Sequence, residues 1–280
     1  MTSRKCDGKS DGGKKKRKRT EKVKKVSAAK STLSAKAGEA KVAKATSTPT
    51  ATAKASQPAW DTWRKSHEIS ITKPEIKPFF NFSEAAEVMA PDLMKVCADF
   101  AEPTPIQAQC WPVILQGHDM VGVAETGSGK TLGFLLPAVK HVLDAGGGRG
   151  SRDHYPRIMC LSPTRELAMQ IQEVANDLGR HCGLTALCCY GGSPKWKQRQ
   201  ALKAGVDIVI GTPGRTKDLL INDHALDLSR VSAMILDEAD RMLDLGFEED
   251  VRTIIGATPA ATRQVTLTLT LSLSLQTLMF

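Results

Sequence analysis

A glycine-rich stretch at residues 124–131 has the residue types and spacing of a phosphate-binding loop. It follows a short apolar run and precedes apolar residues at helical spacing, and a loop between a strand and a helix presents backbone N–H groups to a polyphosphate. Lys130 is placed to reach the β- and γ-phosphate oxygens, and the Thr131 hydroxyl to bind Mg²⁺. Ala124 stands where the strict GxxxxGK[ST] pattern has its first glycine, so the alternative is an ordinary glycine-rich turn with a surface lysine. The candidate nucleotide-binding residues of this loop are Ala124, Thr126, Gly127, Ser128, Gly129, Lys130 and Thr131.

Two carboxylates follow a second apolar run, at residues 234–236. At the end of a buried strand in a phosphate-binding fold, Asp237 is expected to hold Mg²⁺, largely through its waters. Glu238 is expected to orient the attacking water and to act as its general base. A cluster of acids on the surface is the alternative. The expected catalytic residues are therefore Lys130, Asp237 and Glu238.

These motifs need a scaffold, and the chain from residue 119 onward alternates between short apolar runs and amphipathic stretches. The alternation predicts an α/β fold with a mainly parallel sheet flanked by helices, in which ligands bind at the carboxyl ends of the strands. Residues 266–275 alternate Leu with Thr or Ser and predict a strand, whereas residues 83–98 read as a helix that Pro91 breaks. The other expected strands are 158–161, 184–190, 207–210 and 233–236, and the expected helices are 165–178, 195–203, 215–221 and 247–255.

The basic charge of the chain is concentrated at its beginning. Residues 1–57 contain 17 Lys or Arg and 4 Asp or Glu, whereas the whole 280-residue chain has a net charge of +9. Few large apolar groups occur there, so we expect a disordered basic tail over residues 1–57, a linker over 58–78 and a folded domain over 79–280. The basic run at residues 14–19 is typical of a nuclear-import signal or a polyanion-binding patch, with a solubilising role as the alternative.

The seven cysteines include no CxxC pair, and Cys188 and Cys189 are adjacent within an apolar run. This favours buried free thiols and a reducing compartment over a disulfide or zinc site. No stretch has the length of a membrane span, and the lysine-rich N-terminus lacks an apolar signal region. We therefore expect a soluble intracellular protein with no membrane partner.

Taken together, the motifs resemble those of the DEAD-box ATP-dependent RNA helicases, and residues 79–280 resemble the first of that family's two RecA-like P-loop NTPase domains. Residues 103–107 are similar to the family's Q motif, in which Thr104 contributes to the site and Gln107 would read the adenine edge. Phe82 stands at the position of the aromatic residue that stacks on the base. Residues 124–131 resemble motif I, with Glu125 in place of the commoner Gln, and residues 237–240 match motif II. The resemblance implies ATP and Mg²⁺ as cofactors.

The resemblance also implies RNA contacts that do not depend on base sequence. Residues 163–168 are similar to motif Ia, 191–192 to a glycine doublet and 212–215 to motif Ib. Thr164 and Thr212 each follow a predicted strand and precede a helix, so their hydroxyls and the helix-start amides can hold phosphate oxygens. Internal salt bridges are the alternative role for Arg165 and Arg215, and a solvated helix face is the alternative for the basic residues 195–199. The expected RNA-binding residues are Pro163, Thr164, Arg165, Gly191, Gly192, Thr212, Pro213, Gly214 and Arg215.

Two family features are not found in this sequence: the Ser-Ala-Thr motif and the second RecA-like domain, whose arginine stabilises the transition state. An arginine of that kind is worth about 10³- to 10⁵-fold in rate, so we expect this chain alone to hydrolyse ATP poorly. The hypotheses are the ATP-binding part of an RNA helicase, or a non-catalytic module that binds ATP or RNA. The basic tail, with the resemblance, favours nuclear or nucleolar ribosome biogenesis and pre-ribosomal protein partners.

Overall fold

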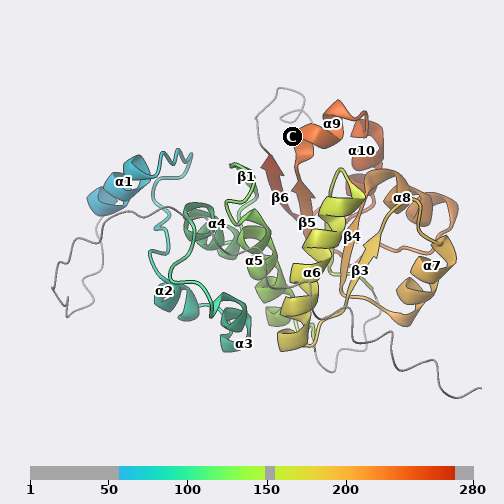
Figure 1. Ribbon diagram of the computed structural model, residues 1–280, viewed down its shortest axis with the longest axis horizontal. Helices are drawn as coiled ribbons and strands as arrows, with labels where there is room; N and C mark the ends of the chain where they lie inside the picture. Colours follow the sequence, from blue (N-terminus) through green and yellow to red (C-terminus); the bar gives the residue numbers. More distant parts are fainter. Residues whose placement is uncertain (1–56, 149–154, 269–280) are drawn as a thin grey trace, which may run out of the picture. The chain divides into compact units, whose positions relative to one another are not determined.

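The computed structural model describes residues 57–148 and 155–268. Its centre is a six-stranded sheet in the order β1-β6-β5-β2-β4-β3, in which every neighbouring pair is parallel (Figure 1). The predicted mainly parallel α/β fold is thus confirmed. The strands are β1 (Met120–Val123), β2 (Ile158–Leu161), β3 (Ala186–Cys189), β4 (Ile208–Gly211), β5 (Ala233–Asp237) and β6 (Arg263–Thr268).

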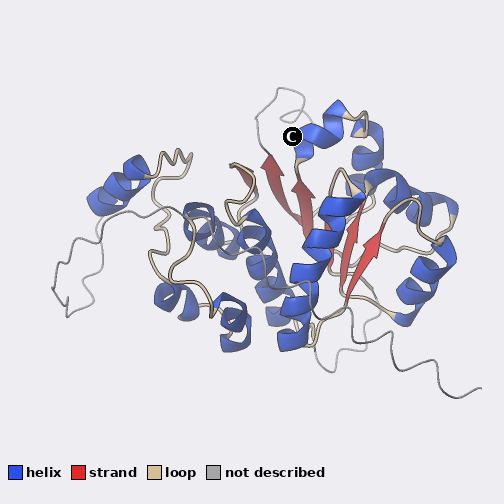
Figure 2. Ribbon diagram, viewed as in Figure 1, coloured by secondary structure: helices blue, strands red, loops and turns tan. Residues whose placement is uncertain are grey.

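Helices cover both faces of the sheet, as Figure 2 shows. On one face, α4 (Pro105–Leu115), α5 (Lys130–Asp144) and α6 (Arg165–Cys182) pack on strand residues such as Cys160 and Ile235. On the other face, α7 (Lys195–Ala204), α9 (Ala239–Asp244) and α10 (Glu248–Gly256) pack with the neighbouring strand residues, such as Leu161 and Leu236. Successive residues of the fully buried strands β2, β4 and β5 therefore enter two separate cores, which explains why these strands read as continuous apolar runs.

The two adjacent cysteines follow the same alternation. Cys188 packs in the first core and Cys189 in the second. Both are free thiols, and burial raises the pKa of each to about 12. The expectation of buried free thiols is confirmed for this pair, and thiols of such high pKa are unreactive near neutral pH.

The segment expected as a linker, residues 58–78, is folded at its beginning. Helix α1 (Gln57–Ser66) carries Arg64, whose side chain is only 4% exposed. Its guanidinium donates hydrogen bonds to the Gln109 side chain (3.0 Å), the Pro74 carbonyl (2.8 Å) and the Ile76 carbonyl. Helix α1 is therefore part of the folded region, which extends upstream of Phe79. These partners lie up to 45 residues away in the sequence, and hydropathy does not reveal such contacts.

The remaining elements lie close to their expected positions. Pro91 separates α2 (Phe82–Ala86) from α3 (Pro91–Met94), which continues as the 3₁₀ turn η1 (Lys95–Cys97), so the predicted break is confirmed. Helix α8 (Pro213–Lys217) begins two residues earlier than expected and continues as the π-helical turn η2 (Asp218–Asn222), and α9 was not predicted because six residues show no clear periodicity. The last strand occupies residues 263–268. Most of the expected strand 266–275, and the expected tail apart from Gln57, lie outside the described residues.

Within these described ranges, no helix is long and apolar enough to span a bilayer.

Candidate functional site

The loop between β1 and α5 has the backbone geometry of a phosphate cradle. Gly127 (φ +79°) and Gly129 (φ +86°) are both in the left-handed region that glycine adopts without strain. Gly129 directly precedes α5, which begins at Lys130 with Thr131 half-buried in its first turn. The Ser128 hydroxyl closes the turn by donating to the Glu125 carbonyl (2.8 Å). The loop therefore leads directly into a 15-residue helix. The first N–H groups of such a helix lack partners within the helix and can bind an anion.

Lys130 is held inside this loop. Its side chain is 8% exposed, and Nζ donates to the Ala124 carbonyl at 2.8 Å. A buried ammonium ion with one neutral partner keeps donor capacity for an anion. A polyphosphate would replace the carbonyl with charged oxygens, which make stronger hydrogen bonds.

Asp237, the last residue of β5, is a nearly buried carboxylate with incomplete hydrogen bonding. It is 3% exposed, and its Oδ1 has no hydrogen-bond partner. Burial raises its pKa to about 6; the Lys130 charge lowers it, and the charges of Glu238 and Asp240 raise it. The electrostatic effect of Lys130 links the two motifs, which are far apart in sequence.

A divalent cation fits this pair of groups. An unpartnered buried carboxylate oxygen is a suitable Mg²⁺ ligand, directly or through water, and Thr131 supplies a hydroxyl at the start of α5. Within the described residues, no group of three or more His, Cys, Asp or Glu is arranged to hold a metal. Mg²⁺ commonly binds through one or two protein groups with waters and phosphates supplying the rest, so the donor set fits Mg²⁺ held together with a nucleotide.

Glu238 has a strained backbone. Its φ of +52° places a non-glycine residue in the left-handed region at the start of α9. Such a conformation costs on the order of 1 kcal/mol and is enriched at functional sites. The side chain is 7% exposed, and its Oε2 lies 3.4 Å from Nη1 of Arg241. The sharp turn places two consecutive carboxylates at the carboxyl end of β5.

The Gln107 side chain links residues 103–107, the segment similar to the Q motif, to the loop between β1 and α5. Its Oε1 accepts from the Thr104 backbone N–H (3.1 Å), and its Nε2 donates to the Gly129 carbonyl (3.1 Å). The side chain is 6% exposed, so its amide is engaged within the protein. Phe82 is half-buried, with its ring centroid 6.2 Å from that of Trp111. The adenine contacts of Gln107 and Phe82 stay predictions.

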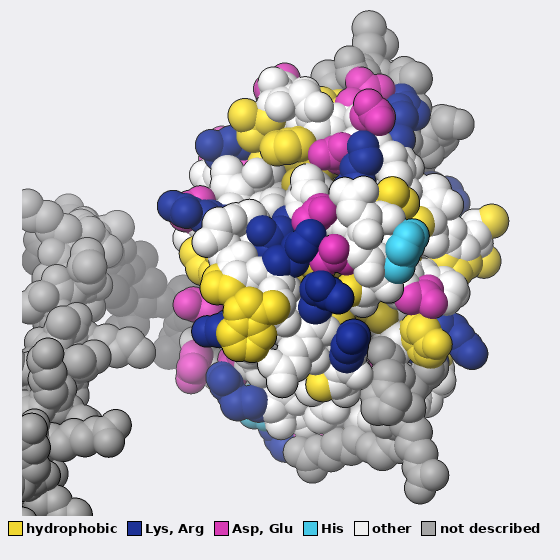
Figure 3. All heavy atoms as spheres, turned by 90° about the vertical axis from the view of Figure 1, so that its right-hand side faces the viewer, with side chains coloured by type: hydrophobic (Ala, Val, Ile, Leu, Met, Phe, Trp, Pro, Cys, Tyr) yellow, Lys and Arg dark blue, Asp and Glu magenta, His cyan; other side chains and the backbone are white. Residues whose placement is uncertain are grey.

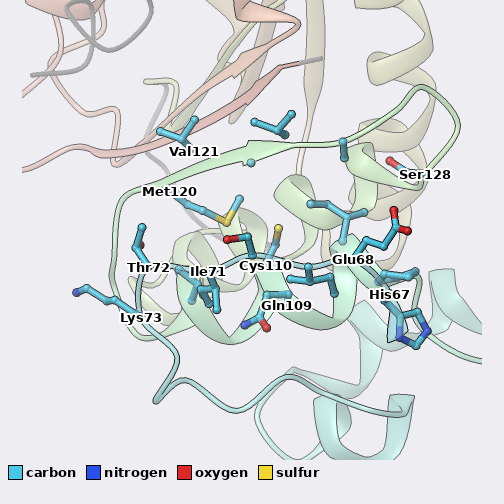
Figure 4. Close-up of a pocket in the computed structure, with 18 of the residues that line it drawn as sticks. His67, Glu68, Ile71, Thr72, Lys73, Gln109, Cys110, Met120, Val121 and Ser128 are labelled. Atoms are coloured by element: carbon cyan, nitrogen blue, oxygen red, sulfur yellow. The ribbon is translucent and has the colours of Figure 1, made fainter. Parts of the chain in front are cut away.

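A cavity of about 610 Å³ borders this loop, and only some of the expected nucleotide-binding residues line it. Figure 4 shows side chains from β1, α4 and the segment after α1 around the same space, with Ser128 at one end. Thr104 and Ala124 also line it, whereas Gln107, Lys130 and Asp237 do not. The segment 67–73 was not foreseen as part of any site. Its one signal is the alternation of Ile69, Ser70 and Ile71, which is typical of an extended segment with one apolar side.

The segments expected to contact RNA lie at the carboxyl ends of three adjacent strands. Residues 163–165 follow β2, 212–215 follow β4 and 191–192 follow β3, and the sheet order places β2, β4 and β3 side by side. Thr164 caps α6, its hydroxyl accepting from the Leu167 N–H (3.3 Å). Pro213 is the first residue of α8, with Thr212 before it and Gly214 after it. Gly192 has φ +83°.

Both arginines of this region have partners within the protein. The exposed Arg165 Nε lies 2.5 Å from Glu166 Oε1. Arg215 Nη1 donates to the Ser193 carbonyl (3.2 Å) and to Gln198 Oε1 (2.8 Å). Arg215 Nε also lies 3.9 Å from Asp218 Oδ2. The internal salt bridges given as alternatives are therefore present for both arginines, and direct contacts of these two side chains with RNA stay predictions.

Comparison with known proteins identifies the family. The DEAD/DEAH box helicase family model matches residues 104–278. The chain is 50% identical over 209 residues to "ATP-dependent RNA helicase DBP3" of Yarrowia lipolytica, which covers 75% of this chain and 38% of that relative. It is 50% identical over 182 residues to "DEAD-box ATP-dependent RNA helicase 5" of Oryza sativa subsp. japonica, covering 65% of this chain and 35% of the relative. The protein of the same name from Arabidopsis thaliana is 53% identical over 169 residues, covering 60% and 31%.

The chain thus spans between about three and four tenths of the length of these relatives. The family match includes more than half of its residues and contains the phosphate-binding loop, both carboxylates and the three segments expected to contact RNA. The chain belongs to the DEAD/DEAH box helicase family.

Proposed function

We propose that the chain is the ATP-binding domain of an ATP-dependent RNA helicase, with ATP and RNA bound at the two ends of the carboxyl edge of the sheet. The observation that carries the proposal is a group of three neighbouring charges. Lys130, at the start of α5, and Glu238, just after β5, both act electrostatically on the buried carboxylate of Asp237 at the end of β5. The remaining support is the row of phosphate-compatible loops after β2, β4 and β3.

The described residues have distinct roles in this proposal. Lys130 exchanges the Ala124 carbonyl for phosphate oxygens, and the N–H groups at the start of α5 hold the same phosphates. Thr131 and Asp237 hold Mg²⁺, which when bound neutralises phosphate charge. Glu238 accepts the proton of the attacking water on a carboxylate oxygen. In the RNA-binding segments, helix-start amides and threonine hydroxyls hold phosphates and leave the bases unread.

The test is ATP binding and RNA-stimulated ATP hydrolysis by this chain, with two variants and a control. Lys130→Ala should weaken ATP binding about 10- to 100-fold, the value of a charged hydrogen bond. Glu238→Gln should keep ATP affinity and lower any turnover about 10²- to 10⁴-fold. Lys140→Ala is the control, because Lys140 is also on α5 but pairs with Asp144 (2.5 Å). ATP binding that Lys130→Ala leaves intact would contradict the proposal.

A second candidate, a non-catalytic ATP- and RNA-binding module, rests on the same geometry. It predicts Lys130-dependent ATP binding without turnover, whereas the first predicts turnover that Glu238→Gln removes. A further comparison tests the role of Gln107: a chain that binds GTP as tightly as ATP would exclude adenine recognition by this side chain.

A nuclear, nucleolar role in ribosome biogenesis with pre-ribosomal protein partners is also proposed. Its support is the basic run at residues 14–19, a composition typical of import signals and polyanion-binding patches. Replacing these six residues with alanine in a fluorescent fusion should abolish nucleolar accumulation. Unchanged accumulation would contradict the role of this run.

A further inference from the structure

Trp196 has the largest exposed fraction, 62%, among the exposed large apolar side chains of the described residues. It is the second residue of α7, and that helix begins just after the glycine doublet 191–192. Burying an indole is worth on the order of 2 kcal/mol. A tryptophan kept in solvent at the edge of a ligand-binding region is therefore a candidate contact residue.

The surroundings of Trp196 are basic. Helix α7 contains four Lys or Arg and no Asp or Glu, and Lys197 Nζ lies 5.6 Å from the Trp196 ring centroid. Lys195 is paired with Asp218 (2.9 Å) and Asp223 (3.1 Å). No ion pair joins Lys197 to an acid in the part of the chain that the structure describes. Figure 3 shows Lys and Arg side chains gathered on this side of the molecule, with acidic ones between them.

Hydrogen bonds fix the start of α7 to the loops proposed to hold RNA. Arg215, from α8, donates to the Ser193 carbonyl and to Gln198, and Gln198 Nε2 donates to the Tyr190 carbonyl (3.2 Å). Gln198 is 4% exposed and faces inward. These bonds fix the start of α7 to α8 and to the loop that contains the glycine doublet, and Trp196, on the same helical turn as the buried Gln198, is exposed to solvent.

We propose that Trp196 and Lys197 form a stacking platform for an unpaired base of single-stranded RNA whose backbone lies on the loops after β3 and β4. The inference rests on the proposed RNA-binding function and extends its contact surface along α7. An aromatic ring accepts any base, and an adjacent ammonium ion attracts the phosphates, so the contact does not depend on sequence. RNA fits better than a protein partner because, apart from Ala204, the other exposed side chains of α7 are Lys, Arg and Gln rather than apolar.

The experiment measures the affinity of the chain for fluorescent single-stranded homopolymer RNA, with a non-hydrolysable ATP analogue present. Trp196→Ala should weaken binding about 5- to 150-fold, the value of one stacked base, whereas Trp196→Phe should keep most of the affinity. Phe100→Ala is the matched control, because Phe100 is an aromatic side chain with 56% exposure located after η1. It should bind RNA like the unchanged chain.

Two further readouts separate contact from a merely structural effect. In a background with Trp60 and Trp63 replaced by Phe, only Trp196 and the fully buried Trp111 emit, and RNA should quench the Trp196 emission. Lys197→Ala should reduce the slope of log affinity against log salt concentration by about 0.7, the value for one phosphate contact on a single strand.

The outcomes distinguish this inference from the proposed function. If Trp196→Ala leaves RNA affinity unchanged and RNA does not quench the Trp196 emission, the stacking platform is overturned and the RNA-binding proposal still stands. That result would favour a protein contact at this surface. No RNA binding by the unchanged chain at low salt would overturn both.

Discussion

The functional groups at the two ends of the carboxyl edge of the sheet differ in whether they have partners within the protein. At the proposed nucleotide end, after β1 and β5, Lys130, Asp237 and Glu238 are each less than 10% exposed, and Asp237 Oδ1 lacks a hydrogen-bond partner. At the proposed RNA end, after β2, β4 and β3, the exposed Arg165 pairs with its neighbour, and Arg215 is bonded to the loop beside it. The first end retains a buried carboxylate oxygen without a partner, whereas both arginines of the second end are already paired within the protein.

This difference has a physical consequence for binding. A buried, incompletely partnered carboxylate and a left-handed Glu238 destabilise the ligand-free fold, and a ligand that supplies the missing partners relieves that cost. The proposed RNA end offers helix-start amides and threonine hydroxyls, groups that can hold phosphates without reading the bases. The proposed binding there is therefore of a polymer whose phosphates are everywhere alike, whereas the proposed nucleotide site takes one particular ligand.

The largest stability effect is expected at the contact between Gly129 and Gln107. A Cβ on Gly129 would lie 2.6 Å from Gln107 Nε2 and 2.9 Å from Thr104 Oγ1, at φ +86°. Gly129→Ala should therefore lower the free energy of unfolding by about 2–4 kcal/mol and weaken ATP binding. Gly127→Ala is the control: at φ +79° its Cβ meets no atom within 4 Å, so the backbone strain alone should cost about 1 kcal/mol. Equal losses in urea denaturation would show that the Gln107 contact is unimportant.

An effect of opposite sign is expected at Asp237. Because burial raises its pKa from 3.8 to about 6, its ionised form destabilises the ligand-free fold above pH 6, and this cost disappears as the pH falls from about 6 toward 4. Asp237→Asn should therefore raise the free energy of unfolding by on the order of 2 kcal/mol at pH 8 and leave it unchanged near pH 4. The same variant should lose the Mg²⁺ dependence of ATP binding. Thermal unfolding across this pH range measures the first effect; a variant less stable than the parent at pH 8 would contradict it.

The smallest effects are expected at the two arginines of the RNA end. Arg215→Ala removes two hydrogen bonds and leaves the buried Gln198 Oε1 without this donor, so it should cost about 1–2 kcal/mol of stability. Arg165→Ala removes an exposed pair and should cost less than about 0.5 kcal/mol. A loss of RNA affinity in Arg165→Ala would then report direct contact. A marked stability loss in this variant would show that the pair with Glu166 is structural.

Much of the site was predictable because its conformation is local in the chain. The left-handed glycines 127 and 129, the helix that starts at Lys130 and the carboxylates after β5 all follow from neighbouring residues. Strands β2, β4 and β5 were recognisable because both of their faces are buried, which gives short continuous apolar runs between helical segments. Family resemblance added the segments expected to contact RNA, which composition does not reveal.

Other features depend on residues that are distant in sequence. Arg64 meets Gln109 across 45 positions, Gln107 meets Gly129 across 22, and the cavity joins the segment after α1 to β1. The bonds of Arg215 to Ser193 and Gln198 likewise fix the start of α7 to α8 across 22 and 17 positions.

Residue types and local spacing thus specified the turns, the helices and strands and the chemical groups, because these depend on backbone preferences and on neighbours along the chain. Folding determined which groups lie together, the raised pKa of Asp237 and the partners of Arg215. Those properties depend on burial and on distances between charges, which exist only once the sheet has brought separate segments to one edge.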